Sequence, residues 1–296
     1  MQLITEEQFI QLSVPFYTTI IAAEIILSNY QKQETYTVKD TAQNIGLMLA
    51  NMLVDVAFRV VYLPILTFLY HFRLFEIHHA LSYWLCLLVA EDFLYYWLHR
   101  TDHICRFFWA SHVTHHTSEK YNLSVGFRST VFEPMYRFLF FAPLPLMGFE
   151  VADIVLMYAM TQIWGILVHT EKIDKMGFLE YILVTPSHHR VHHASNVKYL
   201  DKNMGMFLIV WDKIFGTFQA EIAEKDYQKI KFGLTSEANI SGPINLIFHE
   251  WKAIWADITQ KGLTPSQKWH YIFGPPGWSH DGSRRTSEQM GEDERC

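Results

Sequence analysis

The chain has 296 residues, of which 50% are hydrophobic and 16% aromatic, and its formal net charge is −6. Charged residues make up 18%, below the quarter that is usual in soluble domains. The negative balance leaves no basic surface typical of nucleic-acid binding, so we expect no nucleic-acid partner. The cysteines (Cys86, Cys105 and Cys296) are scattered and odd in number, which argues against a disulfide framework and a CxxC metal site.

Several apolar stretches approach the roughly 20 residues that a membrane-spanning helix needs. They cover residues 9–27, 45–70, 80–98, 131–149 and 151–168. The last two are expected to form a helical hairpin with its turn near Gly148. Strand patterns are weak, so we predict an all-α fold, in which multi-pass membrane helices carry a cytosolic helical lobe with a histidine-rich dimetal site. A soluble protein with very apolar core helices is the alternative.

Charged residues interrupt the first two stretches. Glu24 lies in the first, together with Pro15, and the second contains Asp55 and Arg59. Because Asp55 and Arg59 are four residues apart, we expect them to pair on one face of a helix.

The chain becomes polar from about Pro186 onward. Within this part, residues 246–258 place apolar side chains on one helical face, which indicates a helix that lies on the membrane surface or caps the lobe. We predict one membrane domain over residues 1–275, with a metal-binding core at about 80–220. Residues 276–296 are expected to be a disordered polar tail.

Two copies of the word His-x-x-His-His dominate the chemistry-bearing residues. The first comprises His112, His115 and His116, and the second comprises His189, His192 and His193. On a helix, positions i, i+3 and i+4 point to one side, and the adjacent pair diverges enough to reach two different ions. Thr185 and Pro186 have the form of a helix start just before the second word.

Further histidines end two of the apolar stretches. His99 and His103 are four residues apart at the end of the third stretch, and His169 ends the fifth. Asp92 and Tyr96 lie on the same helical stripe as His99 and His103, where a carboxylate behind an imidazole would fix its tautomer. Asn122 and His188 are also expected to support the ligands from behind.

Nine imidazoles are too many for one ion, but they suit two ions with four or five nitrogens each. Imidazole alone does not distinguish iron, copper, nickel and zinc. The position of the cluster, where apolar helices would leave a membrane and meet a lipid, favours iron. The predicted ligands are His99, His103, His112, His115, His116, His169, His189, His192 and His193.

The spacing of these histidines resembles that of the fatty acid hydroxylase/sterol desaturase superfamily of membrane di-iron oxygenases. The phrases "EDFLYYWLHR", "WASHVTHHTSEKYNLS", "TPSHHRVHH" and "DKNMGMFLIVWDKIFGTF" look closest to its alkylglycerol monooxygenase-like branch. The resemblance implies two iron ions, O2 as co-substrate and oxidation of a C–H bond in a membrane lipid. Hydroxylation and desaturation use the same ligands, and both outcomes stay open.

The resemblance also implies an external electron donor, because the chain has no GxGxxG or comparable fingerprint. Members of the branch carry a glutamate directly after the second histidine of the first pair, where this sequence has Ile104. That departure favours a ferredoxin or a b-type cytochrome over tetrahydropterin. An acidic protein donor is expected to dock near Arg100, Arg106 and Arg190. The alternative within the superfamily is a tetrahydropterin-dependent ether-lipid monooxygenase.

The sequence also predicts on which side of the membrane the metal site lies, and it leaves one rival function open. The connecting segments 100–130 and 170–235 hold many lysines and arginines, which places the metal site on the cytoplasmic side of an integral membrane protein. A multi-pass metal transporter is the alternative from a different class. Its support is limited to Glu24 and Asp55, the acidic residues within the first two apolar stretches.

Overall fold

The computed structural model describes residues 5–235, 240 and 242–294, and these contain helices and no β-strand. Two isolated bridges, Leu183 with Leu208 and Ala194 with Phe232, are the only β-pairings in the described part. The predicted all-α class is therefore confirmed. The helices are α1 (Glu6–Tyr30), α2 (Val38–Tyr70), α3 (Ala80–Ile104), α4 (Arg106–His116), α5 (Pro134–Phe141), α6 (Pro143–Leu146), α7 (Val151–Leu167), α8 (Pro186–His192), α9 (Val210–Phe215), α10 (Pro243–Ile258), α11 (Pro265–Phe273) and α12 (Ser287–Asp293).

Helices α1 and α2 are long and apolar enough to cross a membrane. Only 11% of the most apolar window of each is buried, so neither helix is the core helix of a soluble protein. Thr5 and Thr37 cap their N-termini, accepting hydrogen bonds from the backbone of Gln8 and Asp40. Pro15 does not end α1, which continues through it to Tyr30.

The remaining apolar stretches give shorter or more buried helices. Among the described residues, only α1 and α2 meet both the length and the hydropathy expected of a span, and α7 is shorter, with 17 residues. The stretch 131–149, expected to be one helix, is divided into α5 and α6 where Pro143 and Pro145 follow. The predicted turn at Gly148 is present, with φ +98°, and a Cβ there would lie 2.2 Å from the Phe75 carbonyl oxygen.

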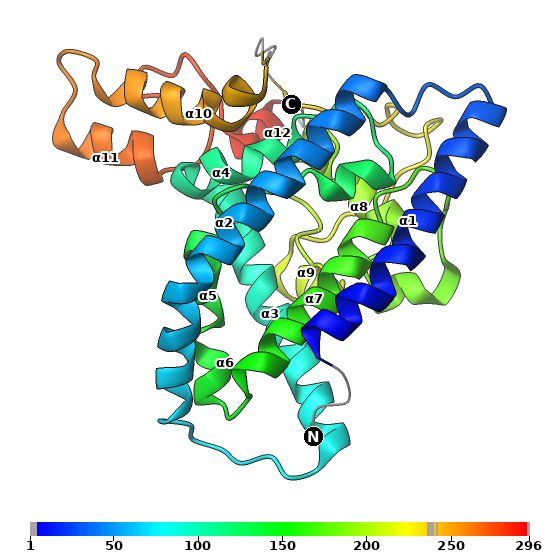
Figure 1. Cartoon of the computed structure of the whole chain (residues 1–296). Coiled ribbons are helices and arrows are strands. Elements are labelled where there is room, and N and C mark those ends of the chain that lie inside the picture. The colour runs from blue at the N-terminus through cyan, green and yellow to red at the C-terminus, as the bar shows by residue number, and fades with distance from the viewer. Residues whose placement is uncertain (1–4, 236–239, 241, 295–296) are drawn as a thin grey trace.

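The core that supports the site lies between α3 and the α5–α7 segment. Its buried side chains include Leu87, Leu98, Phe141, Leu144 and Met157. Helix α3 packs against α4, α5 and α7, while α1 packs against α7 and α2 against α5 (Figure 1). The histidine-bearing helix α4 therefore rests directly on α3.

A chain of ion pairs links α1, α2 and α5. Arg59 pairs with Asp55 at 2.9 Å, as predicted, and also reaches Glu6 at 2.9 Å. On its other side, Asp55 accepts a hydrogen bond from Arg137, which also contacts Glu133 at 3.2 Å. Charges in these apolar helices are therefore paired with one another.

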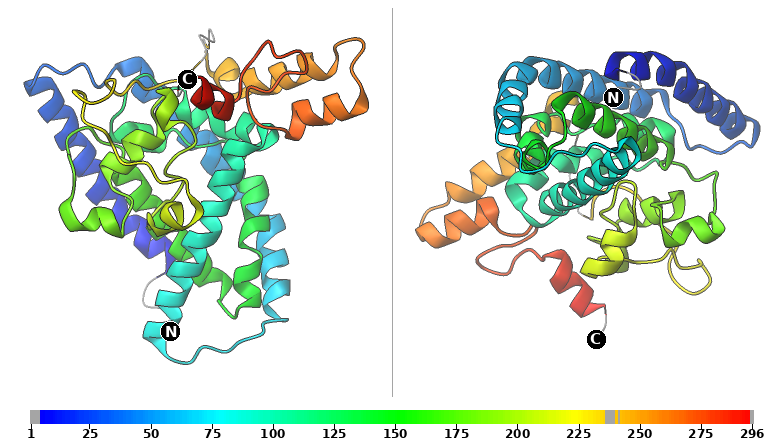
Figure 2. Two further views of the ribbon diagram at one scale, coloured as in Figure 1. Left: turned by 180° about the vertical axis from the view of Figure 1, so that it is seen from behind. Right: turned by 90° about the horizontal axis from the view of Figure 1, so that it is seen from below.

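The polar part of the chain gathers at one end of the molecule. Helices α10 and α11 form a hairpin that projects to one side, and α10 covers the predicted helix 246–258 (Figures 1 and 2). We expected residues 276–296 to be disordered, but the described part of that tail contains a helix. Helix α12 begins after the capping residue Thr286, and Ser287 contacts Asp201. The capping box, with Gln289 as the partner of Thr286, is the local signal for this helix.

Candidate metal centre

Four segments bring the nine histidines together. Helix α3 ends with His99 and His103, α4 carries the first His-x-x-His-His word, α8 and its C-cap carry the second, and His169 follows α7. All are buried except His115, which is partly buried. Pro186 is the first residue of α8 after the N-cap Thr185, as the sequence predicts.

The nine side chains form two groups, in each of which the ligand atoms lie within 4.8 Å of one another. The five-histidine group comprises His99, His103, His112, His116 and His192, and the four-histidine group comprises His115, His169, His189 and His193. The adjacent histidines of each word are divided between the groups, because successive side chains on a helix diverge. The structure thus brings together all nine predicted ligands and separates them into two sets.

Backbone carbonyls determine which ring nitrogen carries the proton in several of these histidines. The Nδ1–H groups donate from His99 to Met204 O (2.8 Å), from His115 to Arg128 O (2.9 Å), from His169 to Gly165 O (2.6 Å) and from His192 to Lys202 O (3.0 Å). A carbonyl oxygen only accepts, so Nδ1 must hold the proton in each ring and Nε2 presents a bare lone pair.

These Nε2 lone pairs face one another inside the groups. His115 and His169 have Nε2 atoms 3.4 Å apart, and both lone pairs are unprotonated by the argument above. The Nε2 atoms of His103 and His192 are buried and have no hydrogen-bond partner. Converging lone pairs repel unless a cation lies between them, so this donor set fits two metal ions bound through Nε2.

Burial keeps the rings in the form that binds metal. It lowers the pKa of His115 to about 4 and holds the pKa values of His112, His116, His189 and His193 well below 6.5. The proximity of the other histidines lowers those four further, since one imidazolium would repel the next. Neutral imidazole is the species that coordinates a metal ion.

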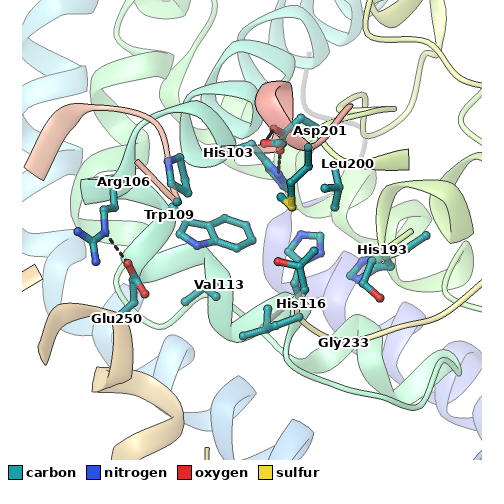
Figure 3. A pocket seen from close by; sticks show the side chains of 18 of the residues that line it. His103, Arg106, Trp109, Val113, His116, His193, Leu200, Asp201, Gly233 and Glu250 are labelled. Atoms are coloured by element: carbon teal, nitrogen blue, oxygen red, sulfur yellow. Dashed lines mark hydrogen bonds and ion pairs between the residues drawn. The ribbon is translucent and has the colours of Figure 1, made fainter. Parts of the chain in front are cut away.

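Two cavities reach the histidines from different directions. A small one, of about 80 Å³, is lined by His99 and His112 of one group and by His115, His169 and His189 of the other. A larger one, of about 410 Å³, reaches His103, His116, His192 and His193 from the side of the polar lobe. Figure 3 shows the larger cavity, with Trp109 between Arg106 and His116. The two cavities touch different members of the set of nine.

The residues that the sequence places behind the ligands have other partners. Asp92 accepts hydrogen bonds from Phe207 N, Leu208 N and Trp211 Nε1, and contacts no histidine. It precedes His99 by two helical turns, roughly 10 Å along the axis, so its carboxylate is too far away to reach that ring. Tyr96 contacts Thr217 and Arg100, because the outer nitrogen of His99 is already taken by Met204.

Asn122 and His188 also form hydrogen bonds with backbone groups. Asn122 caps a short 3-10 helix and donates to Thr35 O. His188 accepts a hydrogen bond from Thr185 N (3.4 Å), and its Nε2 lies 3.9 Å from Glu180. His188 therefore belongs to neither histidine group, and its side-chain partners lie at the start of α8 and at Glu180 instead of behind a predicted ligand.

Carboxylates that do support the ligands were not apparent from the sequence. Asp201 Oδ1 lies 3.2 Å from His103 Nδ1. Asp102 Oδ2 lies 3.6 Å from His112 Nδ1, which is in hydrogen-bond distance of the Thr130 hydroxyl at 3.3 Å. Asp201 is 98 residues from His103 along the chain, so only the tertiary fold brings them together. Asp102 is adjacent to His103, and its spacing gives no distinctive signal.

The expected docking surface for an electron donor needs correction. Arg106 and Arg190 are buried, with 2% and 6% exposure. Arg106 binds Glu250 and Asp257 in α10 and the Tyr271 carbonyl, while Arg190 binds Glu221. These arginines hold the lobe to the core, because buried guanidinium groups need full sets of acceptors. Of the three residues, only Arg100 stays partly exposed.

The segment that contains these histidines matches a known protein family. Residues 84–217 match the fatty acid hydroxylase family, and this range includes all nine ring systems. This match covers the part of the chain that carries the predicted ligands, and it confirms the resemblance inferred from the histidine words.

The chain is also similar to individual proteins of known activity. The chain is 36% identical to human alkylglycerol monooxygenase over 277 residues, which cover 91% of this chain and 60% of that protein. It is 34% identical to alkylglycerol monooxygenase of Xenopus tropicalis, over 91% of this chain and 59% of that protein. An ornithine lipid hydroxylase of Rhizobium tropici is 30% identical over 44% of this chain and 40% of that protein. The chain thus spans about 60% of the length of the monooxygenases, and no solved structure matches it.

Proposed function

We propose that this protein is an iron-dependent, O2-using oxygenase that oxidises an alkyl C–H bond of a membrane lipid. The observation that carries the proposal is the division of nine histidines into a five-ligand and a four-ligand group with their Nε2 atoms turned inward. The position of both groups within a fatty acid hydroxylase domain supports iron as the metal.

The chemistry that bound iron supplies is the reduction of O2 with two external electrons and two protons, so that one oxygen atom enters a C–H bond and the other leaves as water. The chain's own residues orient the histidine rings and exclude water. Carbonyls fix four of the ring tautomers, and the small cavity admits few atoms beside the five histidines that line it. Tyr95, Tyr158 and Gln162 form part of its remaining wall and limit access by water.

An apolar groove offers a place for the alkyl part of the substrate. It has a volume of about 730 Å³ and lies between α3 and α7, where its walls include Leu85, Leu88, Met157, Met160 and Trp164. Its exposed apolar walls suit a hydrocarbon chain better than a soluble metabolite. This groove, with α1 and α2, supports an integral membrane protein that crosses the bilayer more than once. The lysines and arginines of residues 100–130 and 170–235 are the support for a metal site on the cytoplasmic side.

Ether lipids are the alternative substrate, because alkylglycerol monooxygenases are the relatives with the broadest coverage among those compared. The electron donor separates the two versions of the proposal. Ile104, at the end of α3, offers no carboxylate where the resemblance leads us to expect glutamate. We therefore propose a protein donor, a ferredoxin or a b-type cytochrome, in place of tetrahydropterin.

The metal-transporter alternative rests on Glu24 and Asp55, and in the structure both carboxylates are occupied by hydrogen bonds or ion pairs. Glu24 accepts hydrogen bonds from Leu123 N, Tyr36 and Thr170. Asp55 is engaged by Arg59 and Arg137. Carboxylates tied into the fold in this way are poorly suited to pass a metal ion along a pathway.

The test is lipidomics under ¹⁸O2 with membranes that contain the wild-type protein or the His189→Ala variant. The expected result is a lipid that gains one ¹⁸O atom, or a double bond, only with the wild-type protein. Purified protein is then supplied with each electron donor separately. Unlabelled, unchanged lipids with both donors would contradict the proposal, and saturable activity with tetrahydropterin alone would restore the ether-lipid alternative with that cofactor.

A further inference from the structure

One short segment outside the histidine words serves three members of the five-histidine group. Within Asp201–Met204, the Asp201 carboxylate contacts His103 Nδ1 at 3.2 Å, and the carbonyls of Lys202 and Met204 accept from His192 and His99. We call residues 201–204 the acceptor segment. Its three acceptors fix the outer nitrogens of three of the five rings, so its conformation determines how those rings face the ion.

The backbone of the acceptor segment is held in an unusual conformation. Asp201 and Asn203 have positive φ values of 54° and 55°, a region that residues other than glycine rarely adopt, although Asp and Asn tolerate it best. The fully buried Asn203 donates to His188 O and Gln219 O, and Asp212 accepts from Met204 N. Surrounding bonds thus impose a conformation that turns successive acceptors toward the rings.

The C-terminal helix reaches the same segment. Ser287, the first residue of α12, donates its hydroxyl to Asp201 Oδ2, while Asp201 Oδ1 faces His103. Ser287 and Asp201 also line the 410 Å³ cavity, together with His103. The tail of the chain is therefore connected to a metal ligand through a single carboxylate.

The carboxylates make the two groups unequal. Asp201 contacts a ring of the five-histidine group at 3.2 Å, whereas Asp102 lies 3.6 Å from His112 Nδ1, whose nearer neighbour is the Thr130 hydroxyl at 3.3 Å. In the four-histidine group, the hydrogen bonds found for the outer nitrogens within the described residues run to carbonyls from His115 and His169, and His189 Nδ1 is buried with no partner. A carboxylate behind an imidazole raises its basicity and strengthens its bond to a metal ion.

We propose that Asp201 is a positioning residue that makes the five-histidine group the stronger electron-donating site, and that α12 holds this carboxylate in place through Ser287. The inference rests on the proposed two-ion site. It assigns the C-terminal helix a role at the metal centre, in which Ser287 keeps one oxygen of Asp201 occupied and leaves the other aimed at His103.

The test uses full-length protein loaded with ⁵⁷Fe, without lipid or O2, so it is independent of the proposed oxygenase activity. Wild type, Asp201→Asn and Ser287→Ala are compared by Mössbauer spectroscopy and by the rate at which a chelator removes each iron. Asp293→Asn is the matched control, since it makes the same change on the exposed side chain of an α12 residue that pairs with Arg285. Thermal unfolding is followed for every variant.

In Asp201→Asn we expect one of the two iron signals to change and that ion to be held about 10- to 100-fold more weakly. Ser287→Ala affects the same ion to a smaller extent, and Asp293→Asn matches wild type. An Asp201→Asn protein with unchanged signals and retention would overturn the proposal, as would equal loss of both ions together with a lower melting temperature. A Ser287→Ala protein identical to wild type would overturn the role of α12.

Discussion

Individual histidines in this chain differ in role according to their position on one short helix. His189 lies in the four-histidine group, whereas the preceding residue, His188, bonds the backbone at the start of α8. Their side chains point in different directions because successive residues of a helix are rotated by about 100°. Adjacent histidines are thus divided between the proposed metal site and the start of α8.

Substitution of each residue by alanine separates these roles. We expect His189→Ala to lose the ion of the four-histidine group and all turnover. His188→Ala keeps both ions and loses stability of about 1 kcal/mol, because one capping interaction disappears. Metal analysis and thermal unfolding of the purified variants measure the difference. Loss of an ion from His188→Ala, with His189→Ala fully loaded, would reverse the assignment.

The buried rings also make stability depend on pH. His115 has a pKa of about 4 in the folded protein against 6.5 for the ordinary side chain, so the unfolded chain binds more protons between these values. Its contribution is fully present above pH 6.5 and is lost as the pH falls toward 4. Metal-free protein should therefore melt at progressively lower temperature on acidification through this range.

The measurement is the melting temperature of metal-free protein at several pH values, for wild type and His115→Gln. The variant should show a shallower decline on acidification, while the control His270→Gln, which changes an exposed residue of α11, follows wild type. A wild-type melting temperature that stays constant or rises between pH 6.5 and 4 would refute this account of the buried rings.

At the scale of helices and loops, α1 has a role that its apolar sequence does not announce. Glu24, in the C-terminal third of α1, accepts hydrogen bonds from Leu123 N, Tyr36 and Thr170. Thr170 directly follows the proposed ligand His169, and Leu123 begins the short 3-10 helix after the first histidine word. Through one buried carboxylate, α1 therefore holds two ligand-bearing segments against each other.

Removing that carboxylate tests the role of α1. Glu24→Ala leaves three donors without their acceptor, two of them buried, which should cost about 1–3 kcal/mol of stability and loosen the iron next to His169. The exposed residue Glu7 of the same helix provides the control, as Glu7→Ala. Thermal unfolding and iron content are measured for both variants. Equal behaviour of the two would show that Glu24 does not hold these segments.

The predictable elements were those with strong local signals. The two histidine words and the Asp55–Arg59 pair follow from helical spacing, the start of α8 follows from Thr185 and Pro186, and the structure has these features as expected. Asp92 was misjudged because a shared helical stripe does not establish contact across two turns. Asp201 could not be found at all, since 98 residues separate it from His103 and only the folded loop joins them.

Over the whole molecule, a polar lobe and an apolar body meet at the metal centre. The large cavity approaches four histidines from the lobe, and the small cavity touches the other five. Helices α1 and α2 expose apolar side chains over most of their length, which fits contact with lipid. The proposed metal site is therefore reached by two cavities that touch different histidines.

The most direct test of the central claim is the iron content of the purified, full-length protein after iron-replete, reducing expression. The account predicts two iron ions per chain, one for each histidine group. Zinc in place of iron would indicate incorrect loading of the same ligands, because zinc binds such sites more tightly than iron(II). Less than one iron per chain, with zinc also absent, would contradict the two-ion site and the function built on it.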